Sequence, residues 1–175
     1  IVSVNVDTAE IRKEVGGLNV PAAVNFNSPG QVVIAGAVAP VERAMISCKE
    51  AGAKRALPLP VSAPFHTEMM RPAAERLAEQ IAAIKFSAPV IPIVHNVNAK
   101  LESDPAAIKA LMIEQIYSPV LWTGCVQALV GFGVELLVEC GPGKVLSGLT
   151  KRIDKSLSAQ PSESPVDIKK ALAAF

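Results

Sequence analysis

Three closely spaced prolines constrain the fold of this chain more than any other feature. Pro58, Pro60 and Pro64 follow one another along a short stretch. Each proline fixes its own backbone angle and disfavours helical geometry in the residue before it. Because neither a helix nor a central strand can continue through such a stretch, we predict an extended connection here. It separates a first region, residues 1–59, from a second region that begins at residue 60.

The first region has the pattern of a small sheet with helices on one side. Two β-rich runs, Ala22–Phe26 and Gln31–Gly36, flank the turn sequence Asn27-Ser28-Pro29-Gly30, which predicts a hairpin of two antiparallel strands. The order of the elements, β-α-β-β-α-β, is typical of a ferredoxin-like fold. The other expected elements are a strand over Ile1–Val6, a helix over Thr8–Val15, a helix from Pro40 to Gly52 and a strand over Arg55–Leu59.

The second region alternates helices with short apolar strands. Such strands are typical of a parallel sheet covered on both faces, so residues 60–157 are expected to form an α/β unit. Ser and Pro residues cluster over Ser158–Pro165, which predicts a mobile linker, and residues 158–175 are expected to be a tail. The expected elements are a helix over Thr67–Ile84 with Pro72 in its first turn or at a kink, strands over Val90–Val94 and Val134–Glu139, and helices over Asp104–Tyr117, Leu121–Phe132 and Lys144–Ser156.

Composition excludes several classes of protein. Half of the residues are apolar and only 19% are charged, which is not a disorder signature. With 17 basic and 16 acidic side chains, the net charge of +1 gives no field that attracts nucleic acid or an anionic membrane. No apolar run approaches the roughly 20 residues of a membrane span. We therefore expect a soluble, cytoplasmic protein, and one that starts partway through a longer polypeptide, because Ile1 stands where Met would.

His66 is the first candidate for chemistry. It lies after the proline stretch and before a long helix, a loop position from which a neutral imidazole can act as a general base. From position alone, a loop histidine satisfied by solvent or backbone is the favoured interpretation. His95 ends an apolar strand, and a structural role is favoured more strongly there. A base needs a nucleophile, yet no G-x-S-x-G sequence is present and Ser147 lies inside an expected helix.

The remaining reactive or charged groups have ordinary structural interpretations. Cys48, Cys125 and Cys140 are too widely spaced for a disulfide framework or a zinc site, and Cys48 and Cys140 are expected in the core. The Gly141–Lys144 sequence lacks the spacing of a phosphate loop, so a tight turn is expected. Two small basic groups are either solvated surface or contacts for an acidic partner: Lys49, Lys54 and Arg55, and Lys151, Arg152 and Lys155.

Four blocks of sequence resemble the bacterial malonyl-CoA:acyl carrier protein transacylases. The string VNFNSPGQVVIAG at Val24–Gly36 resembles the hairpin of their small subdomain. The string KRALPLPVSAPFH at Lys54–His66 is similar to the segment that carries their catalytic histidine. YSPVLW at Tyr117–Trp122 and ECGPGKVL at Glu139–Leu146 follow in the family's order. The resemblance covers residues 24 to 153 approximately.

The resemblance implies a fold and an activity. The fold would be α/β, a ferredoxin-like small subdomain followed by the C-terminal part of an α/β-hydrolase-like subdomain with a parallel sheet. The activity would be transfer of a malonyl group from malonyl-CoA to the phosphopantetheine thiol of acyl carrier protein in fatty acid biosynthesis, through an acyl-serine. Malonyl-CoA and acyl carrier protein are the implied partners, and no metal or other cofactor is implied.

The resemblance also implies roles for individual residues. His66 would be the base that deprotonates the serine, and the backbone carbonyl of Gln115 would orient its imidazole. Asn27 would line the substrate side of the small subdomain. Phe65 would favour malonyl over a branched acyl group. The basic group is thereby interpreted as a docking surface for acidic carrier protein, through Lys54 and Arg55.

The family's upstream half, with its serine elbow, oxyanion-hole residues and malonate-binding arginine, has no counterpart in this sequence. The chain alone is therefore expected to be inactive, and the missing N-terminal half of the same enzyme is an implied partner. A truncated domain that lost catalysis is the alternative, disfavoured because His66 and its neighbours are intact. The competing functions are a non-catalytic module that binds acyl carrier protein and an RNA binder. The second is remote, since Phe26 is the only aromatic residue in region 1–59.

Overall fold

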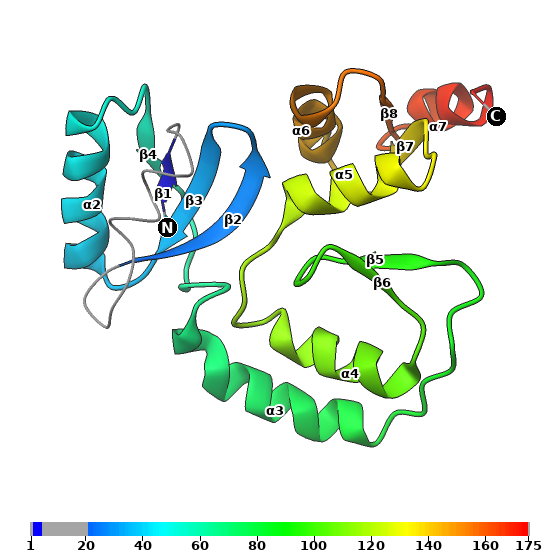
Figure 1. Ribbon diagram of the computed structural model, residues 1–175, viewed down its shortest axis with the longest axis horizontal. Helices are drawn as coiled ribbons and strands as arrows, with labels where there is room; N and C mark the ends of the chain where they lie inside the picture. Colours follow the sequence, from blue (N-terminus) through cyan, green and yellow to red (C-terminus); the bar gives the residue numbers. More distant parts are fainter. Residues whose placement is uncertain (1, 5–20, 175) are drawn as a thin grey trace.

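The structure of the chain is a computed structural model that describes residues 2–4 and 21–174 (Figure 1). Figure 1 places β1 to β4 with α2 at one side, α5 to α7 with β7 and β8 at the other, and α3, α4 and the β5–β6 hairpin below. The elements are β1 (Val2–Val4), β2 (Ala22–Ser28), β3 (Gln31–Ala35), α2 (Val38–Glu50), β4 (Ala56–Pro58), η1 (Glu68–Met70), α3 (Arg71–Ala82), β5 (Ile93–His95), β6 (Lys100–Glu102), α4 (Pro105–Glu114), α5 (Trp122–Gly131), β7 (Leu136–Glu139), α6 (Val145–Ile153), β8 (Ser158–Pro161) and α7 (Pro165–Leu172).

A four-stranded antiparallel sheet forms the first region. Its strand order is β2-β3-β1-β4, and every neighbouring pair is antiparallel. The predicted hairpin is confirmed, because β2 and β3 pair through a turn at Pro29 and Gly30. Gly30 has a φ of 72°, a left-handed conformation that glycine adopts without a Cβ penalty. The predicted helix over Thr8–Val15 lies outside the described residues.

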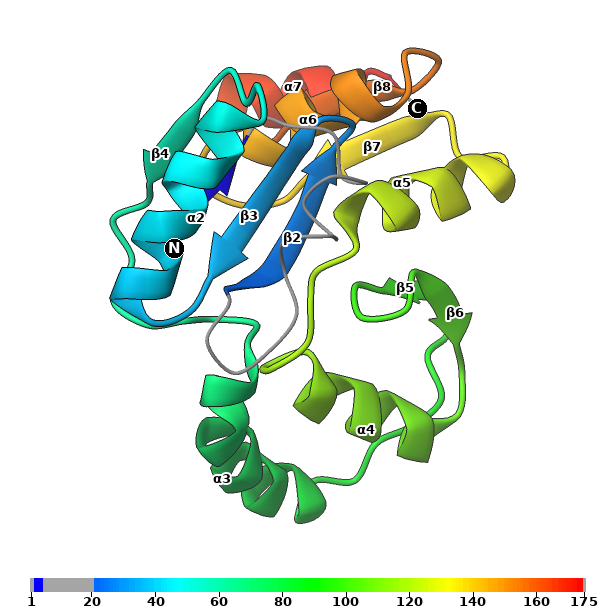
Figure 2. The same ribbon diagram turned by 60° about the vertical axis from the view of Figure 1, so that its left-hand side comes forward.

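The central strand β3 is buried on both faces of the sheet. Successive side chains of β3 point to opposite faces, and Val32, Val33, Ile34 and Ala35 are all at most 4% exposed. Val32 and Ile34 pack in one cluster with Val41 of α2, whereas Val33 and Ala35 belong to a second cluster. Figure 2 shows α2 lying alongside the sheet, and β2 contacts α5 and α6 of the second region. The first region is therefore packed onto the second.

The proline stretch connects the regions without a helix or strand between Pro58 and Glu68, but the prediction that it is extended is wrong: the chain bends at Ser62 and Ala63, and the Val61 N–H donates to the Leu59 carbonyl at 2.8 Å. β4 ends at Pro58, and the next element, the single turn η1, begins only at Glu68. α3 then starts at Arg71 with Pro72 in its first turn, where the missing N–H costs no hydrogen bond. Pro72 was predicted either in the first turn of the helix or at a kink, and the structure places it in the first turn.

The predicted strand over Val90–Val94 differs from the structure in position and in pairing. The strand is β5, and it pairs antiparallel with β6, for which no strand was expected. The turn between them explains the difference. The Ala99 N–H donates to the His95 carbonyl at 2.9 Å, and the Lys100 N–H donates to Oδ1 of Asn98 at 3.0 Å. These contacts reverse the chain before it can cross over to a parallel neighbour.

The prediction of a mobile linker over Ser158–Pro165 is wrong. β8 pairs in parallel with β7 along its whole length, and α7 follows it. Ser164 caps α7, since its side chain accepts from the Asp167 N–H while the Asp167 carboxylate accepts from the Ser164 N–H. Pro165 occupies the first turn. Ser164 and Pro165 are thus helix-opening signals, whereas Ser158 and Pro161 lie in β8. Counted without regard to position, these residues resemble linker composition.

The parallel pair β7–β8, with α6 between the two strands in sequence, gives the second region α/β character. Among the described residues, no helix is long and apolar enough to cross a membrane.

Candidate active site

His66 occupies a strained position in the loop between β4 and α3. Its φ is 62°, a left-handed conformation that residues with a Cβ rarely adopt. Two backbone-directed hydrogen bonds fix the loop around it. The His66 N–H donates to the carbonyl of Ile116 at 3.2 Å, and the Thr67 hydroxyl donates to the carbonyl of Pro64 at 2.7 Å. Strained residues persist only where such contacts hold them, and they are concentrated at functional sites.

The imidazole of His66 is oriented by the carbonyl at the end of α4. Nδ1 lies 2.8 Å from the carbonyl oxygen of Gln115. Because a carbonyl can only accept, this contact requires the proton on Nδ1, which leaves Nε2 with a lone pair. The side chain is only partly buried, so Nε2 can receive a proton from a group outside this chain.

The end of α4 makes these carbonyls available. α4 begins at Pro105 with a cap from Asp104, whose carboxylate accepts from the Ala107 N–H at 2.7 Å. At the other end, the last carbonyls of a helix have no partner within it. The carbonyls of Gln115 and Ile116, just past the end of the helix, both accept from His66.

Hydrogen bonds join the first region to the segment that follows Gln115. The Phe26 N–H donates to the Val120 carbonyl at 2.9 Å, and the Val120 N–H donates to the Val24 carbonyl at 2.8 Å. The Thr123 hydroxyl donates to the Phe26 carbonyl at 3.0 Å. Asn27 follows Phe26 directly, so β2 carries it to the junction between the two regions, where it is partly buried.

Known proteins are similar to this chain in sequence and in fold. A Salmonella typhimurium malonyl CoA-acyl carrier protein transacylase is 52% identical over 172 residues, which are 97% of this chain and 56% of that protein. A Haemophilus influenzae transacylase of the same name is 56% identical over 140 residues, which are 80% of this chain and 45% of that protein. The solved malonyl-CoA:acyl carrier protein transacylase of Xanthomonas oryzae has a TM-score of 0.92 at 47% identity, covering 99% of this chain and 57% of that one.

The chain is similar to malonyl-CoA:acyl carrier protein transacylases. The predicted resemblance and the predicted α/β fold are thereby confirmed. A malonyl-transacylase solved in complex with its type II PKS acyl-carrier protein has a TM-score of 0.93 at 45% identity, covering 99% of this chain and 58% of that one. No protein-family model matches the chain. The chain spans about 56% of the length of the curated transacylases from Salmonella typhimurium and Escherichia coli.

The other residues that the transacylase resemblance singles out lie at or near the surface. Phe65 precedes His66 and is 41% exposed. Lys54 and Arg55 are exposed in the segment that leads into β4. The structure therefore brings His66 and Gln115 into direct contact and places Asn27 at the region junction. It leaves the two basic residues on the surface of the first region.

The transacylase block around Gly141–Lys144 is a tight turn, as expected. The Glu139 carboxylate accepts from the N–H groups of Leu146 and Ser147 at 3.0 and 2.8 Å and from the Ser147 hydroxyl at 2.7 Å. A carboxylate thus occupies the helix N-terminus where a phosphate loop would hold its ligand. The Ser147 hydroxyl is engaged as a donor and is buried, so it is not a free nucleophile. The sequence offered no separate signal for this cap.

The three cysteines lie in different surroundings. Cys48 is buried in the core, as expected. Cys140 is exposed just beyond β7, so the prediction that it lies in the core is wrong. Burial raises the pKa of the Cys125 thiol, which keeps that thiol protonated. In the described part of the chain, no group of three or more potential metal ligands gathers.

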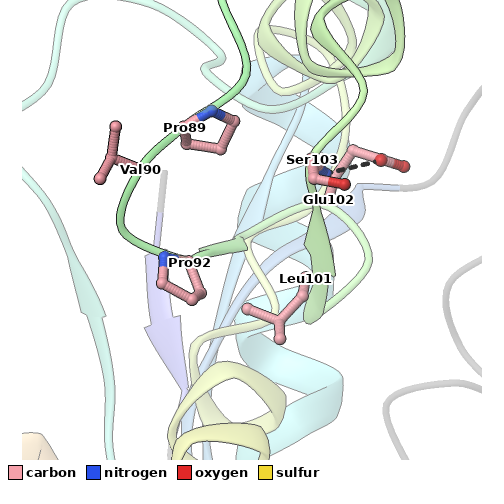
Figure 3. Close-up of a pocket in the computed structure, with 6 residues that line it drawn as sticks. All are labelled: Pro89, Val90, Pro92, Leu101, Glu102 and Ser103. Atoms are coloured by element: carbon pink, nitrogen blue, oxygen red, sulfur yellow. Dashed lines mark hydrogen bonds between the residues drawn. The ribbon is translucent and has the colours of Figure 1, made fainter.

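A hollow of about 280 Å³ lies at the β5–β6 hairpin, apart from the predicted transacylase site (Figure 3). Its polar residues are Glu102 and Ser103, and one carboxylate oxygen of Glu102 accepts from the N–H groups of Ser103 and Asp104. Its lining residues are Pro89, Val90, Pro92, Leu101, Glu102 and Ser103.

Proposed function

We propose that this chain is the histidine-bearing part of a malonyl-CoA:acyl carrier protein S-malonyltransferase, an acyltransferase of fatty acid biosynthesis. The observation that carries the proposal is the 2.8 Å contact between Nδ1 of His66 and the carbonyl of Gln115. It fixes the tautomer whose Nε2 can accept a proton. The similarity to transacylases over 97% of the chain supplies the reaction.

The reaction has two half-reactions that share one base. A serine outside this chain attacks the thioester of malonyl-CoA while Nε2 of His66 takes the hydroxyl proton. The carbon–sulfur bond breaks, and the departing coenzyme A thiolate receives that proton. In the second half-reaction the phosphopantetheine thiol of acyl carrier protein gives its proton to Nε2 and attacks the malonyl-serine. The serine then leaves and recovers the proton.

The remaining residues have supporting roles in this proposal. Asn27 contacts substrate from the small-subdomain side, and Phe65 disfavours an α-branched acyl group. Lys54 and Arg55 dock acidic acyl carrier protein, in keeping with their exposure. The chemistry needs no metal or redox cofactor, and the setting is the cytoplasm.

The fold division is part of the same proposal. Residues 1–59 form a ferredoxin-like small subdomain, which the β2-β3-β1-β4 order supports. Residues 60–157 form the C-terminal part of an α/β-hydrolase-like subdomain, and β8 and α7 continue that unit, because β8 pairs with β7.

A non-catalytic module that binds acyl carrier protein is the second candidate. The observation that favours it is the lack of a nucleophile: no G-x-S-x-G sequence is present, and the Ser147 hydroxyl is bound to Glu139. The two candidates differ in what His66 does. Only the transferase requires its imidazole.

The test uses a hybrid enzyme, in which residues 1–175 are joined to the part of the Salmonella typhimurium transacylase that they do not match. After incubation with malonyl-CoA, intact-protein mass measures the covalent malonyl adduct, and a second assay measures transfer to acyl carrier protein. We expect His66→Ala to lower the rate about 10³-fold, as for a lost general base. His95→Gln, at the chain's other histidine, is the matched control and should retain the activity.

Equal adduct formation and transfer in the hybrid and in its His66→Ala variant would refute the transferase proposal. An inactive hybrid whose chain still binds acyl carrier protein, with and without His66, would support the binding module instead.

A further inference from the structure

An arginine stacked on a tyrosine joins the two segments that carry His66 and Gln115. Arg71 opens α3, one turn beyond the His66 loop, and Tyr117 follows Gln115 closely. The guanidinium carbon of Arg71 lies 4.1 Å from the centroid of the Tyr117 ring. This is within the range in which a cation is attracted by the face of an aromatic ring. The contact therefore bridges the same two segments as the hydrogen bond from His66 to Gln115.

Glu68 fixes the guanidinium from the other side. Nε and Nη2 of Arg71 lie 2.7 and 2.6 Å from Oε2 of Glu68. The two side chains are 48% and 71% exposed, so the ion pair itself contributes little and is screened by salt. Its effect is to limit the rotamers of Arg71 and to present the guanidinium to the ring. The stacking of Arg71 on Tyr117 is the contact that links the segment after His66 to the segment after Gln115.

The His66 loop needs such a contact because of its backbone conformation. A φ of 62° is unfavourable for histidine, so the loop returns to an ordinary conformation unless the surroundings oppose it. The hydrogen bonds that oppose it run to the carbonyls of Gln115 and Ile116. Both acceptors lie just beyond the last residue of α4, in a turn that is tied to the helix by backbone hydrogen bonds, such as the one from the Tyr117 N–H to the Glu114 carbonyl at 3.1 Å. The stack of Arg71 on Tyr117 adds a side-chain contact between this turn and α3.

We propose that Arg71 and Tyr117 are a positioning pair for His66, which holds the Gln115 carbonyl at the distance that orients the imidazole. The inference rests on the proposed function, because it concerns the base of that reaction. Neither residue touches the reacting atoms in this proposal. Their loss allows the imidazole to turn, so it lowers the rate of proton transfer and leaves binding of malonyl-CoA unchanged.

The experiment measures kcat and KM separately in the hybrid enzyme. Arg71→Met removes the cation and keeps the length of the side chain, and Tyr117→Leu removes the ring. We expect each change to lower kcat about tenfold, with the KM for malonyl-CoA within about twofold of the parent. The conservative changes Arg71→Lys and Tyr117→Phe keep a cation and a ring, and should restore kcat to within about threefold. Arg76→Met, an exposed position on the same helix, is the control.

Three results would overturn the inference. An unchanged kcat in both Arg71→Met and Tyr117→Leu would show that the pair positions nothing. A raised KM with an unchanged kcat would make Arg71 a substrate contact. A fall in kcat that matches a fall in the folded fraction, measured by circular dichroism, would make the pair merely structural.

The outcome stays distinct from that of the proposed function. Activity that depends on His66 but is indifferent to Arg71 and Tyr117 removes only this inference, whereas activity indifferent to His66 removes the proposed function. A second readout uses the 175-residue chain itself and needs no activity. The Nδ1–H proton of His66 should give a protected nuclear magnetic resonance signal, lost in Arg71→Met and retained in Arg76→Met. A signal retained in Arg71→Met would contradict the inference.

Discussion

Gly124 and Ala99 form a pair in which Gly124→Ala should stabilise the protein only when it is combined with Ala99→Gly. Gly124 lies in the first turn of α5, against the turn between β5 and β6. A Cβ added at Gly124 would lie 2.9 Å from the Cβ of Ala99, closer than real Cβ contacts. Ala99 is itself strained, with a φ of 55°. Gly124→Ala therefore creates a clash, and Ala99→Gly removes both the clash and the strain.

The magnitudes follow from these two contacts. Replacing a helical glycine by alanine gains about 1 kcal/mol of helix propensity. Overpacking costs about 1–3 kcal/mol, so Gly124→Ala alone should be neutral or destabilise by up to about 2 kcal/mol. Ala99→Gly relieves the left-handed backbone and should stabilise by about 1 kcal/mol. With the clash gone, the double variant should be about 2 kcal/mol more stable than the parent, so the coupling energy is about 1–3 kcal/mol.

Urea unfolding of the four proteins measures this coupling. Trp122 is the single tryptophan of the chain and opens α5, so its fluorescence reports the unfolding of the same helix. Parallel slopes of free energy against urea would show that only stability has changed. If the effects of Gly124→Ala and Ala99→Gly add to within about 0.5 kcal/mol, the two residues do not share a contact and the reasoning fails.

Two further predictions concern the core and the acid stability. Ile34→Ala should destabilise by about 2–5 kcal/mol, because Ile34 is 1% exposed, while the same change at Ile46, 59% exposed, should cost under about 0.5 kcal/mol; equal midpoints in urea would contradict this. Partial burial raises the pKa of Glu139, but hydrogen bonds from Ser147 and Leu146 outweigh it and leave that pKa lowered. The stability that this carboxylate contributes is therefore present above the ordinary glutamate value of 4.5 and is lost as the pH falls through the lower folded value. Glu139→Gln should reduce the loss of unfolding free energy as the pH falls through this range. An unchanged pH dependence would show that other groups cause that loss.

Elements with local signals could be predicted from the sequence. The β2–β3 hairpin has its turn residues between two β-rich runs, and Gly30 takes the conformation that the turn requires. The start of α4 was predicted from Asp104 and Pro105, and the structure shows the cap that these residues make. Such signals involve neighbours in sequence, where backbone preferences and side-chain caps decide the structure without help from the rest of the fold.

Features that depend on distant partners could not be predicted in this way. β8 contains Ser158 and Pro161, residues typical of loops, and it is a strand because β7 pairs with it. Gln115 has no local signal as an acceptor for His66, 49 residues away, and entered the candidate site through the family resemblance alone. Tertiary packing decides both.

The hydrogen bonds that assemble the site have a consequence for how the protein is made. His66 and Gln115 are 49 residues apart, Phe26 and Thr123 are 97 apart, and Gln31 and Arg152 are 121 apart. Closing such long loops costs conformational entropy, and this cost is compensated only when the segments on both sides are already folded and can pack together. We therefore expect these contacts to form late, after the local hairpins and helices. On the ribosome, the small sheet can fold as soon as β4 has emerged. The imidazole is oriented only after Gln115 has also left the exit tunnel, so an interrupted chain carries a histidine without the geometry that makes it a base.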